Sequence, residues 1–152
     1  ILIFAIIVLL LATGIYFYKT YPVVVEECGW DKIQSHAEMI GCLRGLKADL
    51  LKEREEVFNY YLALDQADVD PNFLIPLRDV KEKTSNWYKS TDGYRKAHCE
   101  ARVANYADGS GYFEGIEICE IELIWKDIQF LDERVNELKN YSSNFTPQST
   151  EL

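Results

Sequence analysis

The first 18 residues form an apolar run without a single charged side chain, and this run constrains the chain more than any other feature. It reads ILIFAIIVLLLATGIYFY and ends at Lys19. At a helical rise of about 1.5 Å per residue, roughly 18–20 apolar residues cross a hydrocarbon core of about 30 Å. Because lipid offers the backbone no hydrogen bonds, the run predicts a transmembrane helix over residues 1–19.

A cleaved signal peptide is the alternative interpretation of the same run. The apolar core of a signal peptide usually has about 7–15 residues, which is shorter than this run. Ala12-Thr13-Gly14 is the only sequence before Lys19 that weakly resembles a cleavage site. We therefore expect a retained single-pass anchor, followed by a short linker over residues 20–30 in which Pro22 disfavours a continued helix.

The chain beyond this run, about 130 residues, is long enough for one domain with its own hydrophobic core. It carries all of the charge, and the net charge is −9 at pH 7. Such an acidic domain is unsuited to nucleic acid or to an anionic membrane surface as a partner. The charge favours a cationic partner, although an acidic surface also serves solubility alone.

Four cysteines are scattered through this part of the chain, and none belongs to a C-x-x-C motif. They are Cys28, Cys42, Cys99 and Cys119. With only two histidines, the chain has no standard zinc-binding spacing, so we expect no metal site. An even number of cysteines beside a membrane span predicts two disulfides and a location on the oxidising side of the membrane. Free buried cysteines in a cytoplasmic domain are the alternative.

Hydrophobic periodicity predicts three long helices over residues 31–65, 77–106 and 112–141, joined by turns at 65–76 and 107–111. The buried stripe of the first helix is expected to contain Met39, Leu43, Leu46, Leu50, Val57, Tyr61 and Leu64, with residues 52–56 on the solvated face. Gly41 and Gly45 are expected to permit close packing beside Cys42.

The first turn contains Asp65, Asp68 and Asp70, which lack the spacing of a calcium loop and are expected to form helix-end and capping contacts. Pro71 or Pro76 is expected near the start of the second helix. The stripe of that helix contains Leu77, Val80, Thr84, Trp87, Thr91, Tyr94, His98 and Ala101, which makes His98 a core histidine rather than a ligand.

The third helix carries a strict seven-residue repeat, which is typical of helix-on-helix packing. Its members are Ile121, Ile124, Ile128, Leu131, Val135 and Leu138. The last residues, 142–152, are polar and are expected to form a flexible tail.

These features predict an all-α fold, in which the N-terminal transmembrane helix is followed by an antiparallel three-helix bundle over residues 31–141. In an up, down, up topology, the first helix starts, the second ends and the third starts at the bundle end nearest the anchor. All four cysteines therefore collect at that end, and geometry excludes none of the three possible pairings. Sequence separation favours Cys28–Cys42 and Cys99–Cys119, which close short loops.

Motifs of enzymes do not occur in the sequence. It contains no phosphate loop, no H-E-x-x-H, no G-x-S-x-G and no dinucleotide-binding fingerprint. Its many acidic pairs fall on helix faces, where solvated carboxylates are ordinary. We therefore expect a binding protein without a cofactor rather than an enzyme.

The order and rough spacing of the four cysteines form a pattern together with several short segments around them. The matching segments are Glu38-Met39-x-x-Cys42, Ala48-Asp49-Leu50, Tyr94-Arg95 before Cys99-Glu100, Asp108-Gly109-Ser110 and Cys119. Over roughly residues 28–138, this pattern resembles the LprI-type lysozyme-inhibitor domain. It departs from the family at Thr91, where members have Trp, at Lys96 and at Lys126-Asp127.

The resemblance implies a small helical, disulfide-bonded domain of a bacterial envelope, and it supports the pairing of Cys28 with Cys42 and of Cys99 with Cys119. Some members of the family are reported to inhibit lysozyme. By resemblance, the chain is therefore also a candidate inhibitor of a cationic, lysozyme-like peptidoglycan hydrolase. A protruding turn around residues 107–115 would supply the contacts, and its candidate partner-binding residues are Asp108, Ser110, Tyr112 and Glu114. A plain helix connection is the alternative interpretation of that turn.

The other expected role is that of an accessory subunit of a membrane complex. In this version residues 1–18 anchor the chain in the bacterial inner membrane as a single-pass protein, and the domain lies on the periplasmic side. Exposed rings would form the packing surface: Tyr60, Tyr61, Trp87, Tyr88, Trp125 and Phe130. Rings that fill the core are the alternative. Because the 107–115 turn would lie near the bilayer, a fellow membrane protein is favoured over a freely diffusing hydrolase.

Overall fold

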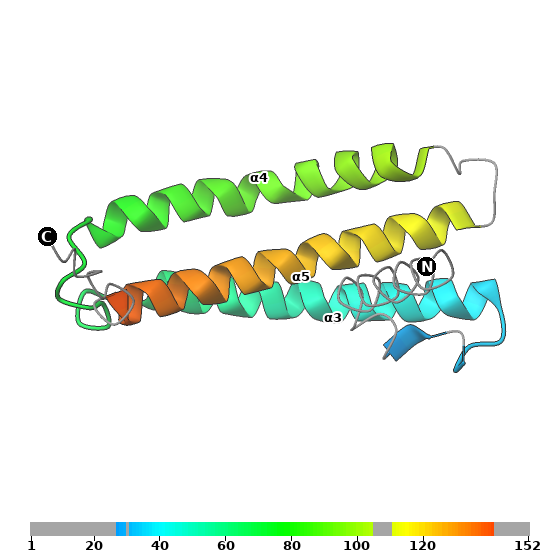
Figure 1. Cartoon of the computed structure of the whole chain (residues 1–152), viewed down its shortest axis with the longest axis horizontal. Coiled ribbons are helices and arrows are strands. Elements are labelled where there is room, and N and C mark those ends of the chain that lie inside the picture. The colour runs from blue at the N-terminus through cyan, green and yellow to red at the C-terminus, as the bar shows by residue number, and fades with distance from the viewer. Residues whose placement is uncertain (1–26, 30, 105–110, 142–152) are drawn as a thin grey trace, which may run out of the picture.

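The computed structural model describes residues 27–29, 31–104 and 111–141, and within these ranges the chain is helical without a strand. Three helices follow one another: α3 spans His36–Ala63, α4 spans Leu77–Val103 and α5 spans Gly111–Lys139 (Figure 1). The predicted all-α fold is thus confirmed for these residues.

The predicted transmembrane helix over residues 1–19, most of the 20–30 linker and the 142–152 tail lie outside the described residues. Among the helices that the structure does describe, none combines the length and the apolar character that a membrane crossing needs.

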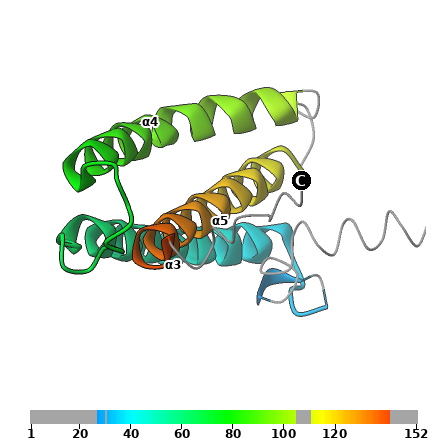
Figure 2. The same ribbon diagram turned by 60° about the vertical axis from the view of Figure 1, so that its left-hand side comes forward.

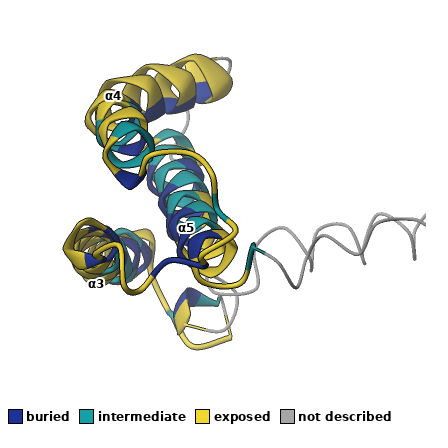
Figure 3. Cartoon of the chain, turned by 90° about the vertical axis from the view of Figure 1, so that its left-hand side faces the viewer, coloured by how far each residue is buried: buried dark blue, intermediate teal, exposed yellow. Residues whose placement is uncertain are grey.

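The three helices run antiparallel in sequence order, and α5 is the central one (Figures 1 and 2). Helix α5 packs against both α3 and α4, whereas α3 and α4 make few direct contacts with each other. Figure 3 looks along the bundle and shows α5 between its two neighbours. The predicted antiparallel arrangement of three helices is therefore confirmed, and α5 is its central helix.

The start of α3 corrects the predicted boundary at residue 31. Ser35 is the N-cap, and its hydroxyl accepts a hydrogen bond from the backbone N–H of Glu38 at 3.2 Å. A carboxylate oxygen of Glu38 in turn accepts from the N–H of Gln34 at 2.9 Å. The pattern S-x-x-E is a helix-start signal, because the serine satisfies a backbone donor that the first turn leaves unpaired and the glutamate reaches back to the residues before the helix.

The loop between α3 and α4 is held by short side-chain contacts, including capping contacts of its aspartates. Asp65 accepts from the backbone N–H of Ala67 at 2.8 Å, and Asp70 accepts from that of Asn72 at 2.8 Å. Pro76 is the residue that precedes α4, as expected. The backbone N–H of Asp70 donates to the carbonyl of Leu138 at 2.8 Å, which ties this loop to the end of α5.

The core follows the seven-residue repeat of α5. All six of its members are buried: Ile121, Ile124, Ile128, Leu131, Val135 and Leu138. One buried cluster surrounds Cys28, Met39 and Ile121 near the start of α3, and the other surrounds Tyr61, Leu77 and Leu138 at the opposite end. The predicted packing role of the repeat is confirmed.

Arg54 is buried, which corrects its predicted place on the solvated face of α3. Its exposed fraction is 2%, and it continues the stripe between Leu50 and Phe58 at steps of four residues. The predicted stripe stepped from Leu50 directly to Val57 and left one turn without a buried residue. The guanidinium fills that turn because carboxylates from the other two helices meet it there.

The predicted buried stripe of α4 is confirmed in the first half of the helix and is wrong in the second half. Thr84 and Thr91 are buried, but Tyr94 and His98 are exposed, so His98 is not a core residue. After Thr91 the buried positions continue in steps of four through Arg95, Cys99 and Val103. Helix α4 therefore turns a slightly different face to α5 near its end, where Cys99 is bonded to α5.

The two disulfides join Cys28 to Cys42 and Cys99 to Cys119. This is the pairing that short sequence separations favour. The first ties the segment before α3 to the second turn of that helix, and the second joins α4 to α5. Both lie toward the bundle end at which α3 and α5 begin and α4 ends, as the predicted topology requires.

Candidate protein-binding groove

The predicted partner-binding turn is only partly within the described residues. Asp108 and Ser110 lie outside them. Tyr112 is half-buried and meets the ring of Phe113 edge-on, with 5.4 Å between the ring centroids. The carboxylate of Glu114 is only 12% exposed and pairs with the imidazole of His36. Glu114 therefore links α5 to the start of α3 instead of protruding toward a partner.

The predicted aromatic surface is mostly an interior feature. Tyr61 is fully buried, and Tyr88 stacks on Phe58 with 3.7 Å between the ring centroids. Trp87 and Phe130 lie 4.3 Å apart between α4 and α5. Tyr60 is the exposed ring of the predicted group, with half of its surface accessible. Most of these rings thus fill the spaces between helices, as the alternative interpretation holds.

A mostly buried ionic cluster joins the three helices. Arg54 of α3 contacts Asp127 of α5 at 2.9 Å and Asp92 of α4 at 3.1 Å. Arg95 reaches the same two carboxylates, at 3.3 Å for Asp127 and 2.5 Å for Asp92. Burial raises the pKa of Asp127, and the two guanidinium groups oppose that rise. The cluster links the three helices, and the exposed side chain of Asp92 is its solvent-facing member.

Other carboxylates along α5 also have cationic partners. Glu117 is buried and contacts Arg44 at 3.0 Å as well as Lys47, and Glu120 contacts Lys47 at 2.8 Å. Burial alone would raise the pKa of Glu122, but hydrogen bonds from Lys126 and Arg102 lower it below its usual value. The acidic groups of this helix are therefore largely neutralised within the fold.

A groove beside the Cys28–Cys42 disulfide differs from these paired regions. It encloses about 560 Å³ between α3, α5 and the segment before α3. Its apolar lining consists of Leu46, Leu50, Trp125 and the disulfide itself, and Gly45 completes one wall. Three acidic residues lie at its edge: Glu27, Asp49 and Glu53. We call this the acidic groove.

No cation balances the acidic groove within the described part of the chain. Glu27, Asp49 and Glu53 are exposed, and none of their carboxylates has an ion pair there. Asp49 and Glu53 lie one helical turn apart, where like charges repel by about 0.2–0.5 kcal/mol. A cationic group from outside would relieve this repulsion.

The spacing of these carboxylates does not suit a metal ion. Among the described residues, no group of three or more His, Cys, Asp or Glu side chains is close enough to hold one. The groove combines these carboxylates with an apolar lining that includes an indole ring. Such a lining suits an organic cation with an apolar stem, because charge and apolar surface are then both matched.

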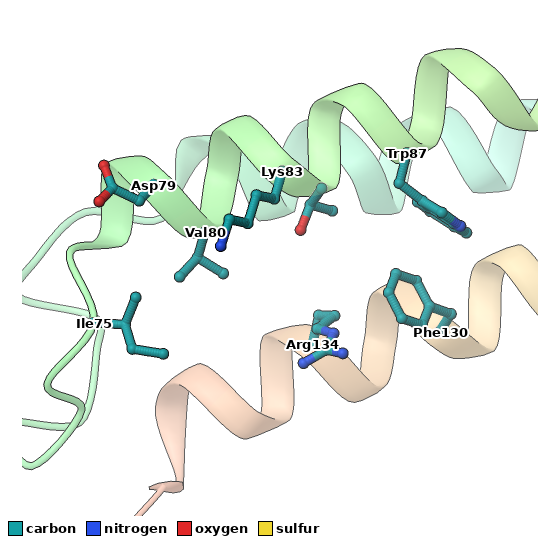
Figure 4. A pocket seen from close by; sticks show the side chains of 8 residues that line it. Ile75, Asp79, Val80, Lys83, Trp87, Phe130 and Arg134 are labelled. Carbon is teal, nitrogen blue, oxygen red and sulfur yellow. The ribbon is translucent and has the colours of Figure 1, made fainter.

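A second groove lies between α4 and α5 at the opposite end of the bundle (Figure 4). It encloses about 310 Å³, with Ile75, Val80, Trp87 and Phe130 as its apolar lining. Its charged residues are of both signs: Asp79, Lys83 and Arg134. Arg134 is paired with Glu137 at 2.6 Å. Because this groove carries charges of both signs, its charge does not favour a partner of one particular sign, unlike that of the acidic groove.

Comparison with protein-family models, with curated proteins and with solved structures finds no match for the chain. The resemblance to the LprI-type domain therefore stays a prediction. The functional assignment rests on the chemistry of the acidic groove.

Proposed function

We propose that the chain is a non-enzymatic protein-binding domain whose acidic groove takes a basic segment of a partner protein. One observation carries this proposal: three acidic residues line a groove with an apolar wall that includes Trp125, and none of them has an ion pair among the described residues. By contrast, Glu117, Glu120 and Glu122 of α5 are paired with cations. The groove is thus a region where the net charge of −9 is locally uncompensated.

The proposed setting is the bacterial envelope, where the domain serves as an accessory subunit of a membrane complex. Residues 1–18 would anchor it as a single-pass protein of the inner membrane, with the domain on the periplasmic side. The apolar run supports the anchor, and two disulfides support an oxidising compartment. A basic juxtamembrane or loop segment of a neighbouring subunit is the expected occupant of the groove.

The test is calorimetric titration of the full chain in detergent micelles with the peptide acetyl-Gly-Arg-Leu-Arg-Gly-amide. The double variant Asp49→Asn/Glu53→Gln is expected to weaken binding about tenfold, because two exposed charge pairs contribute roughly 1–2 kcal/mol together. The matched control is Glu82→Gln/Glu100→Gln, which removes the same charge from exposed positions of α4.

Binding should also weaken with added salt, since exposed charge pairs are screened. Equal loss of affinity in the test and control variants would show that net charge, not the groove, attracts the peptide. Absence of binding to the unaltered chain would overturn the proposal outright.

A second candidate function is inhibition of a lysozyme-like hydrolase, which the LprI-type resemblance favours. Such hydrolases are commonly cationic, so the acidic groove supplies a complementary contact surface in place of Glu114, which is paired with His36. An assay of cell-wall lysis by lysozyme with the full chain tests this. The expected result is inhibition that Asp49→Asn/Glu53→Gln weakens, and no inhibition at a large molar excess would exclude this function.

A further inference from the structure

The interior of the bundle shows how this fold recognises an arginine. The guanidinium carbon of Arg54 lies 4.0 Å from the centroid of the Tyr88 ring. The same guanidinium contacts two carboxylates, Asp92 at 3.1 Å and Asp127 at 2.9 Å. One aromatic face, a hydrogen bond to Asp92 and an ion pair with Asp127 thus hold one planar cation.

The acidic groove presents the same set of groups without a cation among the described residues. Trp125 of α5 supplies the aromatic surface, and Asp49 and Glu53 of α3 supply the carboxylates. Tryptophan is the ring that attracts cations most strongly. Leu46 and Leu50 add an apolar floor that the methylene stem of a long side chain can cover.

We propose that the acidic groove binds an arginine side chain of a partner protein in preference to a lysine, an inference that rests on the proposed protein-binding function. A guanidinium is planar, is weakly hydrated and carries five N–H donors in a fixed fork. It can therefore stack on Trp125 and donate to Asp49 and Glu53 at once. An ammonium is a compact, strongly hydrated point charge, so it satisfies one carboxylate and leaves the other without a partner.

The test compares two peptides that differ in a single cation, acetyl-Gly-Ser-Arg-Leu-Gly-amide and its lysine counterpart. Both are titrated into the full chain in detergent micelles and followed by calorimetry and by tryptophan fluorescence. The arginine peptide is expected to bind about five- to tenfold more tightly. The fluorescence change should disappear in Trp125→Phe and persist in Trp87→Phe, because Trp87 lies in the other groove.

Two further variants separate the ring from the carboxylates. Glu53→Gln, at an exposed position, should lower the preference for arginine to less than twofold because the second carboxylate is lost. Glu82→Gln is the matched control on α4 and should leave the preference unchanged. Trp125→Leu should lower it as well, and circular dichroism would verify that this variant is folded.

The outcomes distinguish this inference from the proposed function. Equal affinities for the two peptides would leave the basic-segment groove in place and overturn the arginine preference. A preference that survives Glu53→Gln and Trp125→Leu without change would place the arginine elsewhere on the molecule. Binding of neither peptide would overturn both proposals.

Discussion

Arg54 of α3 and Asp127 of α5 form an ion pair inside the bundle, with 2.9 Å between Arg54 Nε and Asp127 Oδ2. Their side chains are only 3% and 13% exposed. Arg95 of α4 reaches the same carboxylate at 3.3 Å, so Asp127 connects all three helices. Loss of one partner would leave a charge in a low-dielectric interior with fewer compensating groups, which costs more than the pair itself contributes.

We expect Arg54→Met to lower the free energy of unfolding by about 3 kcal/mol. This is the lower end of the range for breaking a buried pair, because Arg95 still compensates Asp127. Urea denaturation followed by circular dichroism measures the change. Lys52→Met is the control, since it breaks the exposed pair with Glu56 at 3.7 Å and should cost less than about 1 kcal/mol. Equal losses in both variants would contradict the role of the buried cluster.

The sequence could predict α5 because its buried aliphatic residues from Ile121 to Leu138 follow one period. It could not predict that Arg54 is buried, because a cation among Lys52, Glu53 and Glu55 is typical of a solvated face. The only local indication in the sequence was that the predicted apolar stripe has no residue in the helical turn between Leu50 and Val57. Arg54 can be buried at this position because it pairs with Asp92 and Asp127, which lie 38 and 73 residues further along the chain. Contacts between residues so far apart in the sequence are known only from the fold.

The acidic groove was missed for the same reason. Its edge combines residues from α3 and from the segment before it, and its floor includes Trp125 from α5. The sequence does show Asp49 and Glu53 one turn apart, which is a repulsive spacing. The position of Trp125 beside them follows only from the packing of α5 against α3. A predicted turn residue, Glu114, is instead held by His36, a pairing across 78 residues.

The two disulfides are expected to have different effects when they are removed. Each closes a loop, of 14 residues for Cys28–Cys42 and of 20 for Cys99–Cys119, so each contributes about 3 kcal/mol in the chain-entropy picture. Cys28 and Cys42 also line the acidic groove. Replacement of that pair by alanine should therefore lower both thermal stability and affinity for the arginine peptide.

Replacement of Cys99 and Cys119 by alanine is the matched control. It should lower the melting temperature by a similar amount and leave the affinity within twofold, measured below both melting transitions. Loss of affinity in both double variants would mean that general loosening of the bundle, not the groove, controls binding.

Gly115 is the glycine of the described residues at which a methyl group meets a close neighbour. An added Cβ would lie 3.0 Å from Cγ1 of Val103, whose branched side chain is stiff. We expect Gly115→Ala to destabilise the fold by about 1 kcal/mol, because overpacking outweighs the gain in helix propensity. Thermal denaturation of Gly115→Ala and Gly115→Ala/Val103→Ala would test this, since the second change relieves the clash.

Gly93→Ala is the control for that prediction. Nothing lies within 4 Å of a Cβ at this position, so the variant should gain about 0.5–1 kcal/mol from helix propensity alone. A gain of the same size in Gly115→Ala would show that Val103 moves aside without cost.

Glu122 should make the stability of the bundle depend on acidic pH. Burial alone would raise its pKa, but Lys126 and Arg102 lower it below the usual value of 4.5. The unfolded chain then binds a proton before the folded chain does, so the stabilisation is present above pH 4.5 and is lost as the pH falls below it. We expect Glu122→Gln to flatten this part of the curve of unfolding free energy against pH, measured by urea denaturation between pH 3 and pH 6.

Glu137→Gln is the corresponding control, because Glu137 is about half exposed in its pair with Arg134. It should leave the slope below pH 4.5 almost unchanged. An identical slope in the unaltered chain and in Glu122→Gln would show that other carboxylates cause the acid sensitivity.

Gly45 offers a way to narrow the acidic groove without damage to the fold. It lines the groove, and a Cβ built there meets nothing within 4 Å, which also corrects the expectation of close helix packing at Gly41 and Gly45. Gly45→Ala should therefore stabilise α3 by about 0.5–1 kcal/mol. Its methyl group would at the same time take space that the arginine stem needs, so affinity for the arginine peptide should fall several-fold. Gly41→Ala should give the same gain in stability and leave affinity unchanged, and equal affinities for the two variants would place the peptide away from this wall.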